Sequence, residues 1–341
     1  MMRAAVLYDQ AFVVEDRPMP VPGPGEVLLK TRLCGICGSD LHLFKHAAEI
    51  AKLGAELGAP AQDMTKGLVL GHEYVAEVVG FGTDTAQALA IGDRVVSVPF
   101  LIRDGAPMPI GAHVDVAGAY GQYFLGTEML LLKVPDGVPD AAAALVEPLA
   151  IAVHAVAKSP LNGDSHAIVV QGCGPIGLAV AAVLKMRGVT SVTAADFSPR
   201  RRDLALAMGA TRAVDPRQAS PFADLPPGKP VLVFDCTGAK GVLARTIRDA
   251  PQGAHIVVAG IAPGEETISP TIAIAKELAI QFVIYYAPDE FAEALQAVAD
   301  GKLNWQPLVS ATIGLSGVAN VFEELADPER YAKVMIDPWL A

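Results

Sequence analysis

The pattern of apolar and polar positions changes near the middle of the chain. Up to about residue 146, short apolar or alternating runs are bounded by Gly and Pro, as in Val27 to Leu33 after the turn 21–26, which is typical of β-rich structure. From about residue 165, short apolar runs alternate with segments of helical spacing. Such alternation indicates a parallel sheet covered on both faces, the doubly wound α/β arrangement.

The second half of the chain therefore predicts specific elements. The expected buried strands are Ala167 to Val170, Ser191 to Ala195, Val231 to Phe234, His255 to Ala259 and Phe282 to Tyr286. The expected helices between them are Ile176 to Met186, Pro199 to Met208 and Gly241 to Ala250. Two further helical patterns, Pro288 to Asp300 and Ser316 to Leu325, precede a strand-like run, Ala332 to Ile336.

A tail of this length, about 50 residues, is too short to form a domain of its own. We therefore expect it to return to the first domain. The predicted fold class is α/β, with one domain made of residues 1–148 and 288–341 and a second made of residues 149–287.

Composition narrows the possible partners. The 341 residues carry 26 Lys and Arg against 37 Asp and Glu, a net charge of −11, so nucleic acid and anionic membrane surfaces are disfavoured as partners. Four cysteines in so long a chain cannot form a disulfide scaffold and fit a reducing compartment. The apolar run at the N-terminus is interrupted by Asp9, so we expect a cytoplasmic protein.

A glycine-rich turn lies between a predicted strand and a predicted helix. It reads Gly172-Cys173-Gly174-Pro175-Ile176-Gly177, a G-x-G-x-x-G whose glycines let the backbone approach a pyrophosphate at a helix N-terminus. Asp196 follows Gly177 by 19 positions, at the end of the next predicted strand, where a carboxylate accepts from a ribose diol and repels a 2′-phosphate. NAD is therefore expected in preference to NADP. The adjacent run 200–202, three arginines, weakens that preference, and a turn that merely packs helix on sheet is the alternative.

A second group of residues has the chemistry of a metal site. Cys37 is followed by the pair His72 and Glu73, and a thiolate, an imidazole and a carboxylate can hold a tetrahedral zinc with its fourth position open. Cys34 and Cys37 could instead form a redox dithiol, although the thioredoxin-like surroundings of such a motif are missing. Cys34 alone also reads as a small buried hydrophobe.

The chain resembles the zinc-dependent medium-chain alcohol dehydrogenases, in the branch that includes sorbitol, threonine and glucose dehydrogenases. The matching landmarks run in family order along nearly the whole chain: Pro22-Gly23-Pro24-Gly25-Glu26-Val27, Cys37-Gly38-Ser39-Asp40-Leu41-His42, Gly71-His72-Glu73, Gly92-Asp93-Arg94-Val95, Val146-Glu147-Pro148-Leu149, the glycine turn 172–177 and Lys333-Val334. The resemblance implies a GroES-like catalytic domain and a Rossmann domain. It also implies homodimers or homotetramers, since the apolar stretch Thr271 to Tyr286 would supply a sheet edge for pairing subunits.

The resemblance assigns roles to individual residues. It makes Cys37, His72 and Glu73 the zinc ligands, and Glu147 an acid that reaches the zinc directly or through its water. Ser39 and His42 match a proton relay. Further cofactor contacts are expected at Arg201, Thr237 and Gly260. Two plainer readings stay open, Glu147 as a helix N-cap and Ser39 as a turn former.

Two departures from the family pattern change the expectation. The segment Ser97 to Tyr123 has no cysteine, whereas many relatives hold a structural zinc there, so one catalytic zinc and no structural zinc are expected. His72 follows His42 by 30 positions, more than in threonine-dehydrogenase-like relatives. The extra length falls on Lys45 to Gly67, a locally helical segment that is a candidate lid or specificity element.

The expected function is zinc-dependent, NAD-linked oxidation of a small-molecule alcohol to a ketone or aldehyde by direct hydride transfer. The alternatives are a metal-independent quinone or enone reductase of the same superfamily, and a nucleotide-binding protein without turnover. The motifs favour a secondary alcohol. The apolar residues 98–102 and the Ala/Leu-rich insertion could equally shape a pocket for a bulky apolar alcohol.

Overall fold

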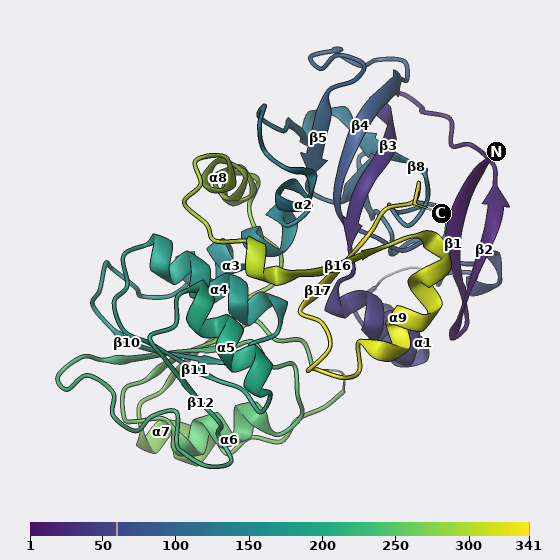
Figure 1. Cartoon of the computed structure of the whole chain (residues 1–341). Coiled ribbons are helices and arrows are strands. Elements are labelled where there is room, and N and C mark those ends of the chain that lie inside the picture. Colours follow the sequence, from purple (N-terminus) through teal and green to yellow (C-terminus); the bar gives the residue numbers. More distant parts are fainter. Residues whose placement is uncertain (59–60, 263, 341) are drawn as a thin grey trace. The chain divides into compact units, whose positions relative to one another are not determined.

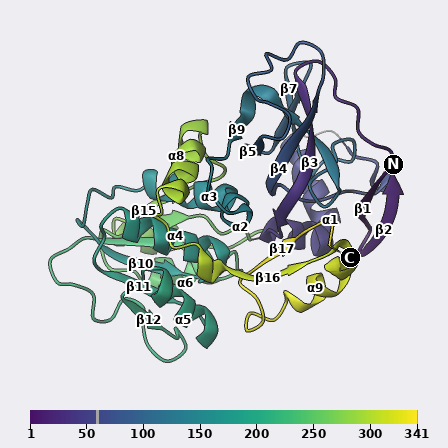
Figure 2. The ribbon, with the colours of Figure 1, turned by 45° about the horizontal axis from the view of Figure 1, so that its top comes forward.

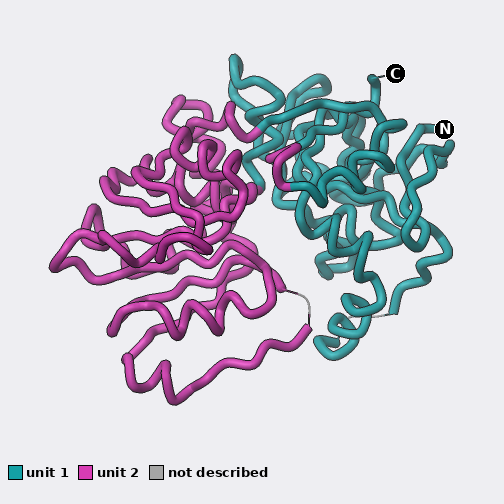
Figure 3. Tube along the Cα trace, turned by 60° about the horizontal axis from the view of Figure 1, so that its bottom comes forward, with its two compact units in different colours: residues 1–147, 309–327, 333–341 teal, residues 148–308, 328–332 magenta. Residues whose placement is uncertain are grey.

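The computed structural model describes residues 1–58, 61–262 and 264–340. The chain divides into two compact units (Figure 3). Unit 1 comprises Met1–Glu147, Val309–Asp327 and Lys333–Ala341, and unit 2 comprises Pro148–Leu308 and Pro328–Ala332.

Unit 1 is built on a seven-stranded sheet, in which β3 and β4 form the central antiparallel pair (Figures 1 and 2). Its strands follow the order β16-β17-β3-β4-β5-β9, and β8 also pairs with β3. Their bounds are β3 Glu26–Gly35, β4 Glu73–Phe81, β5 Arg94–Ser97, β8 Tyr123–Thr127, β9 Leu131–Lys133, β16 Val309–Ile313 and β17 Lys333–Ile336. Two hairpins complete the unit, β1 Met2–Tyr8 with β2 Ala11–Arg17 and β6 Phe100–Arg103 with β7 Ala106–Pro109.

The C-terminal segment returns to unit 1, but the return begins at Val309 and not at residue 288 as expected. Strands β16 and β17 join its sheet, and Phe322 of α9 (Val318–Glu324) packs on Phe12 and Phe44 with ring centroids 4.5 and 5.5 Å apart. Residues 288–308, which we expected in the first domain, belong to unit 2. Helix α8 (Pro288–Ala299) is held there by Glu290, whose Oε2 lies 2.7 Å from Nδ1 of His154.

Unit 2 is an all-parallel sheet in the order β12-β11-β10-β13-β14-β15. Its strands are β10 Ala167–Gln171, β11 Val192–Ala195, β12 Arg212–Val214, β13 Val231–Asp235, β14 His255–Val258 and β15 Ala279–Phe282. Helices α4 (Pro175–Met186) and α5 (Pro199–Met208) cover one face, and α6 (Val242–Asp249) and α7 (Pro270–Ala275) cover the other (Figure 1). The fold class is therefore the predicted one.

Two details of the predicted strands were wrong. The last strand of the parallel sheet is β15, Ala279–Phe282, and not Phe282 to Tyr286, because the chain bends after Val283 and Tyr285 takes a left-handed φ of 58°. Strands β12 and β16 were missed. The first is only three residues long and the second carries polar residues at alternate positions, so neither gives an apolar run.

The expected helical segment Lys45 to Gly67 is largely helical. Helix α1 runs over Gly38–Glu56 with non-helical dihedral angles at His46, and a 3-10 turn covers Met64–Lys66. Positions 59 and 60 of this segment lie outside the described residues. Helices α2 (Asp140–Ala143) and α3 (Val146–Ala157) together span a stretch apolar enough to cross a membrane, and 72% of that stretch is buried, as in the core of a folded domain.

Candidate active site

Three side chains with metal-ligating atoms meet where β3 ends and β4 begins. Cys37 lies just beyond the end of β3, at the N-cap of α1; Glu73 is the first residue of β4, and His72 immediately precedes it. The antiparallel register sets Gly35 opposite Glu73. A Cβ at Gly35 would lie 2.3 Å from Oε2 of Glu73, so only glycine leaves room for this carboxylate.

The ligand atoms of Cys37, His72 and Glu73 all lie within 4.8 Å of one another. Ligands of a tetrahedral zinc are separated by about 3.3 to 3.8 Å, given its bond lengths, so small side-chain adjustments bring these three atoms onto one ion. A thiolate, an imidazole and a carboxylate are also the donors that zinc accepts. The residues therefore fit a zinc ion with one open position.

The carboxylate of Glu73 is held by a buried lysine. Lys333 of β17 donates to Oε1 and Oε2 of Glu73 at 2.8 and 2.6 Å and to the carbonyl oxygen of Ile36 at 2.9 Å. Both side chains are 1% exposed. Burial alone would lower the pKa of Lys333, but attraction by Glu73, Cys37 and Glu147 outweighs it and raises the pKa, so the ammonium stays charged in this apolar setting.

The imidazole of His72 is oriented from behind by Asp40. The Oδ1 atom of Asp40 lies 3.5 Å from Nδ1 of His72 and has no hydrogen-bond partner among the described residues. Its Oδ2 accepts from the Tyr120 hydroxyl at 2.8 Å and from the Cys37 amide at 2.9 Å. A carboxylate at Nδ1 is the usual partner of a metal-bound histidine, because it leaves Nε2 for the metal.

The charges around His72 favour a cation. Burial on its own would lower the pKa of His72, but the charges of Asp40, Cys37 and Glu147 and a hydrogen bond that the ring donates to Cys37 raise it well above the ordinary value. Glu147, in the first turn of α3, is 8% exposed and is close enough to act on both His72 and Lys333. Anionic groups that stabilise a protonated imidazole also stabilise a divalent ion at the same place.

The two relay candidates lie on the first turns of α1. The Ser39 hydroxyl is 3.5 Å from Nε2 of His72, on the side where the metal would sit. His42 is half-buried, and its pKa is lowered from the ordinary value by burial and by repulsion from His46 and Lys45. His42 is therefore neutral near pH 7 and can accept a proton.

The glycine turn of unit 2 has the shape of a pyrophosphate cradle. Gly172 has a φ of +81°, and a Cβ at Gly177 would lie 1.8 Å from the carbonyl oxygen of Gly172. At Gly174, the N-cap of α4, a Cβ would meet no atom of the described residues within 4 Å, so this face of the turn is open. Pro175 and Ile176 follow in the first turn of α4, whose free amides favour an anion.

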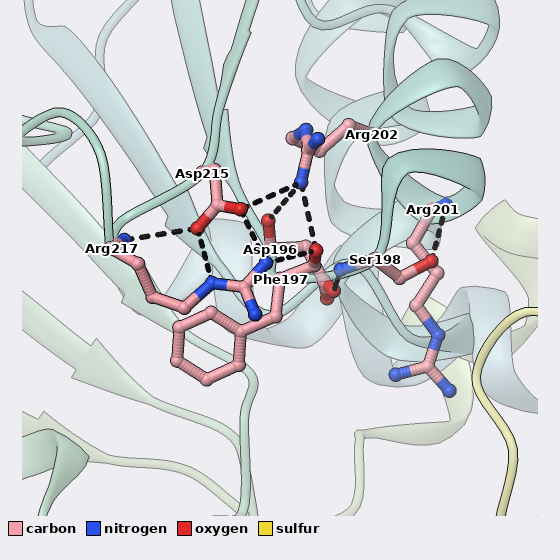
Figure 4. Close-up of polar contacts among 7 residues, drawn as sticks. All are labelled: Asp196, Phe197, Ser198, Arg201, Arg202, Asp215 and Arg217. Atoms are coloured by element: carbon pink, nitrogen blue, oxygen red, sulfur yellow. Dashed lines mark hydrogen bonds and ion pairs between the residues drawn. The ribbon is translucent and has the colours of Figure 1, made fainter.

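Three of the remaining cofactor candidates, Asp196, Thr237 and Gly260, follow the carboxyl ends of β11, β13 and β14, and the fourth, Arg201, lies in α5. A Cβ at Gly172 would contact Thr237 at 2.9 Å, and a Cβ at Gly260 would lie 2.8 Å from the Thr237 amide nitrogen. Asp196 follows β11, and its two carboxylate oxygens each accept a backbone amide, from Cys173 and Ser198, both at 2.8 Å. Figure 4 shows the Arg201 side chain extending from the far side of Ser198, away from the other two arginines.

Comparison with known proteins matches both units to known families. Residues 23–136 match the alcohol dehydrogenase GroES-like domain, and residues 175–300 match the zinc-binding dehydrogenase family. A (R,R)-butanediol dehydrogenase from Neisseria gonorrhoeae is 31% identical over 99% of both chains. The chain belongs to the zinc-dependent medium-chain alcohol dehydrogenase family. It is an oxidoreductase that acts on CH–OH donors.

Other proteins similar to this dehydrogenase are also named dehydrogenases. A sorbitol dehydrogenase from Gallus gallus is 27% identical over 91% of this chain and 89% of its own. The crystal structure of 2R,3R-butanediol dehydrogenase from Bacillus subtilis has a TM-score of 0.82 at 29% identity, covering 99% of this chain and all of its own. A protein described as a zinc-binding dehydrogenase from Sinorhizobium meliloti, solved with NADP, has a TM-score of 0.84 at 26% identity, covering 99% of both chains.

Sequence reasoning left three supporting residues of the dehydrogenase without a role. Asp40 and Lys333 fell inside quoted motifs, and Tyr120 was only the end of the cysteine-free segment. The signal for Lys333 was its place within an otherwise apolar strand, where a lysine needs a buried partner. Nothing in the sequence could have paired Tyr120 with Asp40, which is 80 positions away.

The described part of the extra segment 45–67 contacts the cysteine-free segment of the dehydrogenase. The side-chain amide of Gln62 donates to the carbonyl of Ala112 at 3.3 Å and accepts from the amide of Val114 at 2.9 Å. Lys66 pairs with Asp115 at 2.9 Å. These exposed contacts join the cysteine-free segment to the extra segment without any cysteine ligand.

Proposed function

We propose that this dehydrogenase oxidises a secondary alcohol, of the vicinal diol or polyol class, to a ketone with NAD as hydride acceptor and one zinc ion per chain. The observation that carries the proposal is the convergence of Cys37, His72 and Glu73 within 4.8 Å. The butanediol and sorbitol dehydrogenases among the relatives support the substrate class. Unit 1 would supply the catalytic groups and unit 2 the cofactor site.

The zinc ion would act as a Lewis acid that makes the substrate hydroxyl easier to deprotonate and so favours hydride loss to the nicotinamide. Cys37, His72 and Glu73 would hold the ion, with Glu147 facing it or its water. Lys333 keeps Glu73 fixed and Asp40 keeps the His72 ring oriented. The Ser39 hydroxyl would take the substrate proton and pass its own outward, and neutral His42 would accept it.

The finer assignments rest on separate observations. Asp196, at the end of β11, favours NAD, since a second anion beside its carboxylate would be repelled. One zinc per chain is supported because, among the described residues, one group of at least three His, Cys, Asp or Glu side chains could hold a metal. The four cysteines, all within the described ranges, form no disulfide, as expected in the cytoplasm.

A homodimer or homotetramer is proposed from the edge of the parallel sheet. Among the strands that the structure describes, β15 pairs with one neighbour in that sheet, β14. Large apolar side chains on and near it are exposed, among them Phe282 of β15 itself at 64% and Ile274 of α7 at 76%. A partner subunit that adds its own edge here would bury them.

The test is NADH formation from NAD across vicinal diols, polyols and bulky apolar secondary alcohols, repeated after chelation and after zinc is added back. The account expects turnover on diols or polyols that chelation removes and zinc restores. Chelator-resistant turnover on quinones or enones would favour the metal-independent reductase. Cofactor binding with no turnover on any alcohol would favour the non-catalytic binder.

A pair of cysteine variants separates the zinc site from a redox dithiol. Cys37→Ala should lose zinc and activity and keep NADH binding. Cys34→Ala should keep zinc and activity, because burial raises the pKa of Cys34 well above its usual range and leaves it a thiol. Equal loss of activity in the two variants, with zinc retained, would support the dithiol.

A further inference from the structure

A cluster of charges beside Asp196 includes a second carboxylate, Asp215. Asp215 follows β12 as Asp196 follows β11, and these two parallel strands are neighbours, with Ala195 opposite Val214. The Asp215 side chain is 5% exposed. Figure 4 shows Arg202 and Arg217 converging on it from two sides.

Asp215 occupies the side of Arg217 that would otherwise bind an anion. The Nε of Arg217 donates to Oδ1 of Asp215 at 2.8 Å, and its Nη2 donates to Oδ2. This paired set of donors is the one that a guanidinium offers to phosphate oxygens. The guanidinium also lies over the Phe197 ring, 5.0 Å from its centroid.

Arg202 is held in the same cluster. Its Nη1 donates to the backbone carbonyls of Asp196 and Phe197, both at 2.9 Å, and lies 3.6 Å from Oδ2 of Asp215. Both arginines therefore lie next to the loop that carries Asp196, but their donors face carbonyls and a carboxylate. Hydrogen bonds from Arg217 hold the pKa of Asp215 at about 2, so the carboxylate is charged throughout the neutral range.

We propose that Asp215 is a specificity-determining residue for the cofactor: it occupies and neutralises Arg202 and Arg217 so that they cannot bind a ribose 2′-phosphate. Asp196 alone would repel that phosphate, but two free guanidinium groups beside it would offset the repulsion. The inference rests on the proposed preference for NAD and adds the residue that protects it.

The experiment measures the dissociation constants of NADH and NADPH by nicotinamide fluorescence on the zinc-loaded protein, without turnover. In Asp215→Asn the ratio of the NADPH constant to the NADH constant should fall about tenfold, through tighter NADPH binding once no carboxylate charge neutralises the two arginines. Asp224→Asn is the matched control. It removes a carboxylate from an exposed pair with Arg212 in the same unit, and its ratio should equal that of the wild type.

A second variant changes the ratio in the opposite direction and covers the case in which Asp215→Asn does not fold. Arg217→Leu leaves the carboxylate paired with Arg202 alone, so the ratio should rise. A ratio within twofold of the wild type in the folded variants, with NADH still preferred, would overturn the role of Asp215 and leave the NAD preference standing. A wild type that binds NADPH more tightly than NADH would overturn both.

Discussion

Replacement of Lys333 by methionine tests whether the buried ion pair behind the candidate zinc site is as tightly coupled as its geometry implies. Lys333 and Glu73 are each 1% exposed, and two charged hydrogen bonds of 2.6 and 2.8 Å join them. Lys333→Met leaves the Glu73 carboxylate buried without its cation. Breaking a buried pair in this way costs about 3 to 5 kcal/mol, which corresponds to a fall in the urea midpoint of about 1 M or more.

The two tryptophans allow this loss to be measured in unit 1 alone. Trp339 belongs to unit 1 and Trp305 to unit 2, so in a Trp305→Phe background the fluorescence reports on unit 1. Trp339 is well placed for this, because its Nε1 donates to the carbonyl of Thr31 at 2.7 Å and unfolding breaks that contact. The measurement is made on chelator-treated protein, so that metal loss does not contribute to the difference.

Lys66→Met is the matched control. The Lys66 to Asp115 pair has a similar separation, 2.9 Å, but both side chains are 52% exposed, so its loss should leave the urea midpoint unchanged within error. If Lys333→Met shifts the midpoint no more than Lys66→Met does, the Glu73 carboxylate does not depend on Lys333 and the reasoning is refuted.

Three further variants test the other parts of the site. Tyr120→Phe removes the hydroxyl that donates to Asp40 and should weaken zinc binding by about tenfold or more. The zinc affinity is measured by competition with a chromophoric chelator, and an unchanged value in the variant would contradict the supporting role of Tyr120. His42 has a lowered pKa, so its protonation should reduce alcohol oxidation only as the pH falls below the ordinary histidine value of 6.5. His42→Asn should lower kcat/KM and remove this loss of activity at acid pH. An unchanged dependence of kcat/KM on pH in the variant would exclude the relay. Gly177→Ala places a Cβ 1.8 Å from the Gly172 carbonyl oxygen and should abolish NADH binding. Gly174→Ala, where space is open, should leave the protein folded. Equal NADH affinity in Gly177→Ala and the wild type would contradict binding of the cofactor pyrophosphate by the glycine turn.

Sequence reasoning located the long, regular parts of the fold well. Helix α4 and strand β10 were predicted within one residue at each end, because an unbroken apolar run and the glycine turn mark both of them. Strand β12 was invisible, since Arg212, Ala213 and Val214 show neither alternation nor an apolar run and form a strand only by pairing with β11. Such a strand is determined by its neighbour and not by its own residues.

The candidate site divides in the same way. Cys37, His72 and Glu73 could be predicted as ligands from their residue types and motifs. The register of β3 and β4 brings them together. The supporting contacts could not be predicted, because Glu73 and Lys333 are 260 positions apart. The same holds for Asp215: its partner Arg217 is only two positions away, but its proposed role depends on the neighbouring strand end that carries Asp196.

The most direct test of the central claim is a zinc titration of chelator-treated protein in which bound zinc and alcohol-dependent NADH formation are measured in the same samples. The account predicts that both rise together and saturate at one zinc per chain, and that Cys37→Ala shows neither. Full activity before any zinc is bound, or saturation of bound zinc with no gain in activity, would contradict a catalytic metal held by Cys37, His72 and Glu73.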